Sequence, residues 1–264
     1  MLKEEILKKY KNEEHLLVSR VLDKVELADK NKQIQCTDFL NMNEQAIVKN
    51  VINQTKEHVI FYGGYEEAER KILFVIPKGY NKVIKQMDYD RYIGVMRISL
   101  SNKIKEKYTH RNYLGALMKL GIKREKIGDI LVDDDGADII ACKDIINFLY
   151  INLQLLKRFE KCTIQEINIK ELKKIIAIPQ YKTIQVSSMR LDNIISEISN
   201  TSRSKANQMI LDKKVFINYL CESKVTKQIK EKDTITIRGI GRFKINQIIG
   251  NTRKGKINIK IEYF

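Results

Sequence analysis

Residues 190–217, RLDNIISEISNTSRSKANQMILDKKVFI, contain the clearest structural pattern in the last third of the chain. The first apolar residues of this stretch recur at steps of three and four and therefore share one helix face: Leu191, Ile194, Ile195 and Ile198. Ala206, Met209 and Ile210 predict a second helix, and residues 215–217 predict a strand. Further on, the apolar residues of 257–263 alternate strictly with polar ones, which indicates half-buried antiparallel strands. We expect a domain over 185–264.

Charge singles out the same region. The chain carries 49 Lys and Arg against 33 Asp and Glu, a net charge of +16. From Gln185 onward there are 16 basic against 7 acidic residues. Such an excess favours a polyanionic partner. No apolar run reaches the ~20 residues of a membrane span, and neither an amphipathic anchor helix nor a lipidation signal is present. Nucleic acid is therefore favoured over membrane.

Compartment and cofactors follow from equally simple features. The four cysteines (Cys36, Cys142, Cys162 and Cys221) lie far apart and form no C-x-x-C pair, which disfavours zinc and redox motifs. The first five residues include two acids and no apolar core, unlike a secretory signal. We expect a cytoplasmic protein with no cofactor and no metal.

The length of 264 residues predicts two or three domains. At the start of residues 1–87, apolar residues recur every four positions, which predicts helical structure. Another helix is predicted after Asn43, and two short strands follow at 59–62 and 72–76. We interpret residues 1–87 as a small α+β domain.

Residues 90–180 follow a clearer order. A strand over 93–100 precedes a helix that Thr109 caps and Gly121 ends. Residues 130–132 and 139–141 flank a turn rich in Asp and Gly, a helix covers 144–156, and a strand covers 162–169. This β-α-β-β-α-β order is the ferredoxin-like unit that RNA-recognition-motif domains share, so the fold class is α+β throughout. Strand 137–141 lacks the aromatic residues that stack bases, which predicts that the sheet is architectural or contacts RNA only through its edges and helices.

The segment Ser202-Arg203-Ser204-Lys205 is the best candidate phosphate site. Ser202 is a suitable N-cap, which puts two cations into the first helical turn, where they oppose the helix dipole. A helix start binds anions through its free N–H groups, so the cations are tolerable if a phosphate is the occupant. The alternative is a solvated surface turn.

Further basic residues surround this segment. The candidate RNA contacts are Arg190, Ser202, Arg203, Lys205, Lys213, Lys214, Arg238, Arg242, Arg253, Lys254 and Lys256. Lys214 could instead complement a helix C-terminus, and a lone basic hairpin is usually a solvated loop. His110 and Arg111 are a possible secondary contact, with a capping or solvent-facing role equally open.

Two other motifs carry less weight. Asp133-Asp134-Asp135-Gly136-Ala137-Asp138 superficially looks like a calcium loop, but it lacks the distal Glu and the helical frame, so a hairpin turn is favoured. Gly63-Gly64 could bind a phosphate through its backbone. A turn is favoured, because the pair lies between two strands and no lysine follows at P-loop spacing.

The last domain contains several short motifs that resemble a known RNA-binding module. Residues 190–192, 202–206, 209–210, 215–218 and 232–235 resemble the S-four RNA-binding domain. The resemblance implies that Arg190, Ser202, Arg203, Lys205 and Lys213 face structured RNA. Lys213 and Tyr219 stand where glycine is often found. The backbone conformation of these two turns therefore cannot be predicted from the resemblance.

The rest of the chain resembles the YlmH family of bacterial proteins. The signatures are FYGGYEEAER, residues 61–70, and HRNYLGALM followed by GIKREKIGDI, residues 110–118 and 121–130. Asn112 stands where an acid is expected. The resemblance implies a factor that binds rRNA and tRNA on the large ribosomal subunit, including stalled subunits with peptidyl-tRNA, and a link to cell division.

Three functions remain to be weighed. The first is a non-catalytic ribosome- or tRNA-binding factor. The second is an RNA-modifying enzyme of the pseudouridine synthase or methyltransferase type, for which no catalytic motif is evident. The third is a DNA-binding cell-division protein. We favour the first, with no DNA partner expected.

Overall fold

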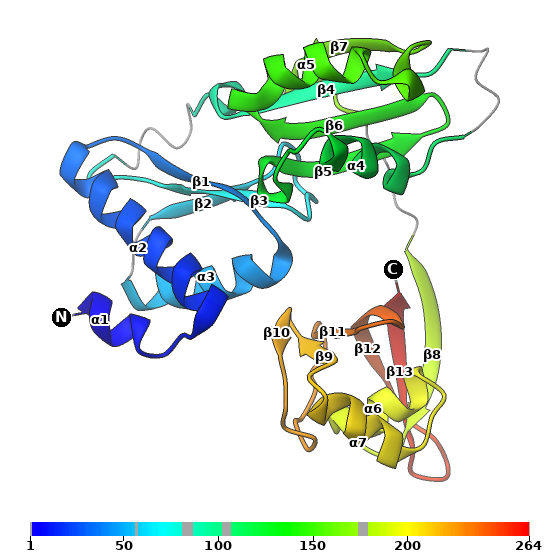
Figure 1. The fold of residues 1–264 in the computed structure, drawn as a ribbon. Coiled ribbons are helices and arrows are strands. Elements are labelled where there is room, and N and C mark those ends of the chain that lie inside the picture. Colours follow the sequence, from blue (N-terminus) through cyan, green and yellow to red (C-terminus); the bar gives the residue numbers. More distant parts are fainter. Residues whose placement is uncertain (1, 56–57, 81–86, 102–106, 174–178, 264) are drawn as a thin grey trace. The chain divides into compact units, whose positions relative to one another are not determined.

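A computed structural model describes residues 2–55, 58–80, 87–101, 107–173 and 179–263 (Figure 1). The chain divides into two compact units, residues 1–175 and 176–264. No helix among the described residues is both long enough and apolar enough to cross a membrane.

The first part of unit one is a three-stranded antiparallel sheet with helices. Its elements are α1 (Leu2–Leu7), α2 (Asn12–Asn31), β1 (Gln35–Leu40), α3 (Met42–Thr55), β2 (Val59–Tyr62) and β3 (Lys71–Val75). The strand order is β1-β3-β2. The predicted helices and the strands β2 and β3 are confirmed. Strand β1 was not predicted, because its sequence QCTDFL is polar until the last two residues, which alone are buried.

The second part of unit one contains the β-α-β-β-α-β succession expected for residues 90–180. Its elements are β4 (Ile93–Ser99), α4 (His110–Lys119), β5 (Ile127–Asp133), β6 (Gly136–Cys142), α5 (Ile146–Gln154) and β7 (Thr163–Ile167). Short 3-10 turns flank or connect these elements at Tyr89–Arg91, Arg124–Lys126, Lys143–Ile145, Lys157–Phe159 and Ile169–Glu171. The sheet is antiparallel with strand order β5-β6-β4-β7. One face packs on α4 and α5 through residues such as Tyr113, Leu117 and Leu149.

The small sheet of unit one is buried on both faces. One face packs on α2 and α3, with Val21, Val48 and Leu73 in the shared core. The other face, which includes Phe74, shares a buried cluster with Ile140 and other residues of the four-stranded sheet. The two sheets therefore belong to one continuous core, which is why contacts join them into a single unit.

Local hydrogen bonds explain where helices start in unit one. Asn41 Oδ1 accepts from Glu44 N at 3.0 Å, and Asn41 N donates to Glu44 Oε2 at 2.7 Å, a capping box before α3. Thr109 N donates to Asn112 Oδ1 at 2.8 Å before α4. Asn112 therefore takes over the acceptor role of the acid expected there. Helix α4 ends at Lys119, just before Gly121, whose φ of 76° is left-handed.

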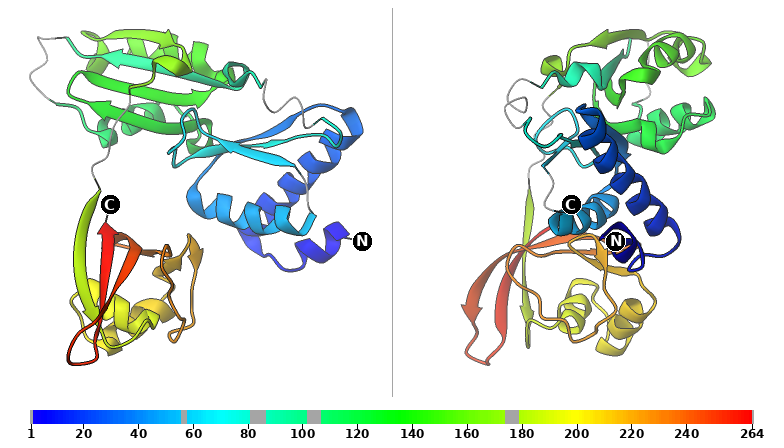
Figure 2. Two further views of the ribbon diagram at one scale, coloured as in Figure 1. Left: turned by 180° about the vertical axis from the view of Figure 1, so that it is seen from behind. Right: turned by 90° about the vertical axis from the view of Figure 1, so that its left-hand side faces the viewer.

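Unit two is a six-stranded antiparallel sheet with two helices. Its elements are β8 (Gln180–Val186), α6 (Leu191–Ile198), α7 (Arg203–Leu211), β9 (Val215–Ile217), β10 (Leu220–Cys221), β11 (Thr234–Ile237), β12 (Gly241–Asn251) and β13 (Ile257–Tyr263). The strand order is β10-β9-β11-β12-β13-β8. Both helices bury their apolar residues against the same side of the sheet, as the views of Figure 2 show.

Unit two includes a strand that begins before the predicted start of the last domain at residue 185. Strand β8 pairs with β13 over its whole length, from Gln180 opposite Tyr263 to Val186 opposite Ile257. It therefore lies across the gap expected between 180 and 185. The strand was missed because only Ile184 and Val186 of its seven residues are buried, too few for a clear alternation.

Candidate nucleic-acid interface

The first helix of unit two starts at a buried carboxylate that holds two arginines. Asp192 is 1% exposed. Arg190 Nε and Nη2 donate to its two oxygens at 3.0 Å each, and Arg203 Nη2 donates to Oδ2 at 2.5 Å. Arg190, two positions before Asp192, and Arg203, eleven positions after it, thus bind the same carboxylate. The side chains of Arg190 and Arg203 stay 36% and 56% exposed.

The charges of this cluster stabilise one another. Burial by itself would raise the pKa of the Asp192 carboxyl, but hydrogen bonds from Arg190 and Arg203 outweigh it and hold the pKa below its usual value. Hydrogen bonding to Asp192 likewise raises the pKa of Arg190. The carboxylate is therefore ionised at neutral pH. Each arginine carries five N–H donors, so donors remain for a second partner.

Helix α7 begins as predicted. Ser202 is its N-cap, and Ser202 Oγ accepts from Lys205 N at 3.3 Å. The side chains of Arg203, Ser204 and Lys205 are exposed in the first turn. The hydroxyl of Ser202 is occupied by the cap, so the charged contacts available to a ligand here come from Arg203 and Lys205.

The end of α7 brings two further candidates together with Arg238. Lys213 adopts a left-handed φ of 57°, so lysine takes the backbone conformation that glycine would favour. Lys214 Nζ lies 3.1 Å from Asp212 Oδ2, which fits its alternative role at a helix end. The carbonyl of Lys214 accepts from Arg238 N at 2.9 Å. The guanidinium of Arg238 lies over the ring of Phe216, 4.8 Å from its centroid.

Tyr219, the second residue that replaces an expected glycine, also lies in a left-handed turn. Asn218 and Tyr219 link β9 to β10 with φ values of 49° and 70°. Two consecutive left-handed residues form the tight hairpin turn that suits twisted strands. Arg242, which sits in β12 and not in the turn before it, lies 5.5 Å from the centroid of the Tyr219 ring.

The last three candidates lie elsewhere on the unit. Arg253, Lys254 and Lys256 are exposed in the turn between β12 and β13, which Thr252 closes with a hydrogen bond from its N to Lys256 O at 2.7 Å. β12 has 11 residues, so its two ends are roughly 30 Å apart. This turn is therefore distant from Arg238 and lies near the end of β8, which leads to Arg190.

His110 and Arg111 lie in unit one, in the first turn of α4, and both side chains are exposed. The cap of this helix is made by Thr109 and Asn112, so His110 is not the capping residue. RNA contact and plain solvent exposure therefore remain open for these two residues.

The two signature stretches of unit one, residues 61–70 and 121–130, meet at a joint that was not predicted from the sequence. Asp129 accepts from Tyr65 Oη at 2.9 Å, Glu69 N at 2.7 Å and Arg70 N at 3.1 Å. Arg70 in turn donates to Ile127 O at 2.9 Å. The signature residues 61–70 and 121–130 thus hold the two sheets together.

The glycines of the signatures fit this joint. A Cβ on Gly63 would lie 2.2 Å from the carbonyl oxygen of Arg70, and one on Gly128 would lie 2.8 Å from the ring of Phe39. Gly63-Gly64 forms the predicted turn. The Asp-rich segment is a hairpin turn as well, because β5 and β6 pair with Asp133 opposite Gly136. Its last residue, Asp138, is buried and paired with Arg97 at 2.7 Å.

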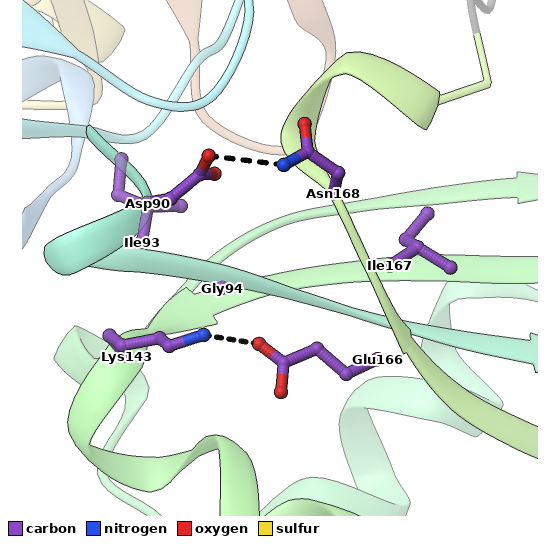
Figure 3. Close-up of a pocket in the computed structure, with 7 residues that line it drawn as sticks. All are labelled: Asp90, Ile93, Gly94, Lys143, Glu166, Ile167 and Asn168. Atoms are coloured by element: carbon purple, nitrogen blue, oxygen red, sulfur yellow. Dashed lines mark hydrogen bonds and ion pairs between the residues drawn. The ribbon is translucent and has the colours of Figure 1, made fainter. Parts of the chain in front are cut away.

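A shallow hollow of about 360 Å³ in unit one offers little chemistry (Figure 3). Lys143 is paired with Glu166, and Asp90 Oδ2 accepts from Asn168 Nδ2 at 3.1 Å. The polar groups thus satisfy one another. Among the described residues, no cluster of three His, Cys, Asp or Glu could hold a metal ion.

Comparison with known proteins places the chain in a family. The family model "YlmH, N-terminal" matches residues 13–80, and "Putative RNA-binding domain in YlmH" matches residues 85–171. The chain is 27% identical to "Ribosome-associated protein quality control protein P2" of Bacillus subtilis (strain 168), covering 98% of each chain. A solved structure, "Cell division protein ylmH from Streptococcus pneumoniae", aligns at a TM-score of 0.48 and 17% identity, covering 62% of this chain and 97% of that one. The chain belongs to the YlmH family.

Proposed function

We propose that the chain is a non-catalytic RNA-binding protein that acts on the ribosome. The observation that carries the proposal is the arginine pair on Asp192 beside the exposed start of α7. Two preoriented guanidinium groups and Lys205 present positive charge where a helix N-terminus also attracts anions. Phosphates of structured RNA match this chemistry.

The domain architecture is part of the proposal. We take unit two as an S-four domain, because its helices α6 and α7 carry the matching residues and both glycine-type turns keep left-handed backbones. We take the part around β4–β7 as a ferredoxin-like domain, since its strand order and two helices on one face suit that fold.

The ribosomal target rests on relatives. One family model describes an RNA-binding domain, and the Bacillus relative is named for ribosome-associated quality control. We therefore propose rRNA and tRNA of the large ribosomal subunit, in the handling of stalled translation, as the partners. The cell-division link that the family resemblance implies stays a prediction.

The enzymatic alternative finds no support at Asp192. Its two oxygens accept three hydrogen bonds from arginines and the residue is 1% exposed, so it cannot attack a uridine. Mass mapping of ribosomal RNA from a strain that lacks the protein tests the alternative. A missing modification would revive it.

Co-sedimentation with ribosomal particles tests the proposal directly. We expect Arg203→Ala with Lys205→Ala to weaken binding several-fold, because each removes a charged phosphate contact. The matched control is Arg20→Ala with Lys30→Ala, which removes two exposed cations from α2. Wild-type binding by the first variant would contradict the proposal.

A further inference from the structure

The sheet of unit two has a second face, on the side away from α6 and α7. Register places Phe216 opposite Thr236 and Thr236 opposite Arg242. It also places Lys244 opposite Glu262 and Glu262 opposite Tyr181. Since side chains alternate along a strand, these residues point away from the helices, while their neighbours Ile217, Ile235 and Ile261 are buried against them.

Aromatic rings on this outer face are each paired with a cation. Lys260 Nζ lies 4.3 Å from the centroid of the Tyr181 ring on β8, and Arg238 lies 4.8 Å from that of Phe216 on β9. Tyr181 is 45% exposed. Four strand spacings separate β8 from β9, so the two rings mark the ends of a face roughly 20 Å wide.

The charge of the outer face is positive. The strands contribute or flank it with four cations: Arg238, Arg242, Lys244 and Lys260. Glu262 is the one acid that the register of β8, β9, β11, β12 and β13 directs there. In the described part of unit two, no helix covers this face. An exposed cation–aromatic pair stabilises a fold by only about 0.5–1 kcal/mol, so stability alone is a weak reason for the set.

We infer that this outer face is a second RNA contact, which stacks unpaired bases of a single-stranded segment. A base has a flat π-face that stacks on aromatic rings and on guanidinium planes, and the lysines and arginines attract the backbone beside it. Paired bases inside a helix expose no such face. The inference rests on the proposed function and assigns a different surface and a different form of RNA from the Asp192 cluster.

The absence of tryptophan from the sequence allows a direct test. Tyr181→Trp introduces a single tryptophan on the outer face, whose emission can be followed separately from that of the tyrosines. Tyr263→Trp is the matched control, because Tyr263 on the adjacent β13 is 39% exposed but lies on the helix side, in line with Ile261. We expect unpaired oligouridine to quench the Tyr181→Trp protein and to leave the Tyr263→Trp protein nearly unchanged.

A second pair of variants tests charge on the two faces. Lys260→Ala and Lys182→Ala each remove one lysine, from neighbouring strands and opposite sides of the sheet. We expect Lys260→Ala to weaken binding of oligouridine roughly fivefold, which corresponds to the ~1 kcal/mol lower end of what one stacked base contributes, and Lys182→Ala to have a smaller effect.

The outcomes separate this inference from the proposed function. Equal quenching or none in the two tryptophan variants, together with intact binding of a stem-loop RNA that depends on Arg203 and Lys205, overturns the inference alone. Binding of neither RNA overturns both. Quenching confined to Tyr181→Trp that persists in the Arg203→Ala, Lys205→Ala background supports a separate second contact.

Discussion

Two pairs of arginines show opposite uses of the same side chain. At the joint of unit one, Arg70 and Arg124 both donate to the carbonyl of Ile127, and burial lowers the pKa of Arg124 to about 10. In unit two, Arg190 and Arg203 donate to one carboxylate and stay partly exposed. Arginines that end on backbone carbonyls hold the fold together. Arginines anchored by a single acid keep donors for a partner.

Arg70→Ala should give the largest effect on stability. It leaves the buried carbonyls of Ile127 and Phe39 without this donor, so we expect the free energy of unfolding to fall by about 2–4 kcal/mol. Urea unfolding measures it. Arg91→Ala, which breaks an exposed pair with Asp88, is the control and should cost less than about 1 kcal/mol. Equal midpoints for the two variants would contradict a structural role for Arg70.

Asp192→Asn should weaken RNA binding several-fold although it makes the protein more positive. The amide keeps the shape but loses the charge that orients Arg190 and Arg203. Asp212→Asn removes an equal charge from an exposed position in the same unit and should leave binding unchanged or slightly tighter. Fluorescence anisotropy with a stem-loop RNA compares them. Tighter binding by Asp192→Asn would show that its acid does not position the arginines.

The salt dependence of binding should reveal how many phosphates the cluster contacts. About five contacts predict a log–log slope near −3.5 to −4.5. Arg203→Ala with Lys205→Ala should make the slope shallower by about 1.4–1.8, because each contact contributes about 0.7–0.9. The Arg20→Ala, Lys30→Ala control should keep the wild-type slope. An unchanged slope in the first variant would mean that these side chains do not reach phosphate.

Lys213→Gly should give the smallest effect. The left-handed backbone at Lys213 costs a side-chain-bearing residue about 1 kcal/mol, so glycine should raise the melting temperature slightly. Lys214→Gly removes the same charge at a position without positive φ and should not stabilise. A drop in melting temperature for Lys213→Gly would indicate that its side chain makes contacts that outweigh the strain.

The fold could be predicted wherever apolar periodicity was strong. Helix α6 and strand β13 were placed within a residue, because four of the eight residues of the one and four of the seven of the other follow a clean period. Strands β1 and β8 were missed, since most of their side chains are polar and only partly covered. Their pairing depends on partners far away in the sequence, which local patterning does not report.

The candidate site could be predicted by residue type but not by arrangement. Arg190, Arg203 and Lys205 were named from charge and helix-start chemistry. The anchoring role of Asp192 could not be seen, because it depends on two helices that meet only in the folded state. The basic residues predicted to surround Ser202–Lys205 do not all lie close together, because β12 separates Arg238 from Lys254 by most of its length.

The joint between Arg70 and Asp129 also determines how the first unit can be divided. Its hydrogen bonds link residues 59 positions apart, and the apolar side of the small sheet, with Phe74, is covered by Ile140 of the other sheet. A fragment that ends near residue 87 would present that apolar side to water and would be prone to aggregate. The two segments predicted as separate domains thus lie in one compact unit, and we expect them to unfold together in a single transition.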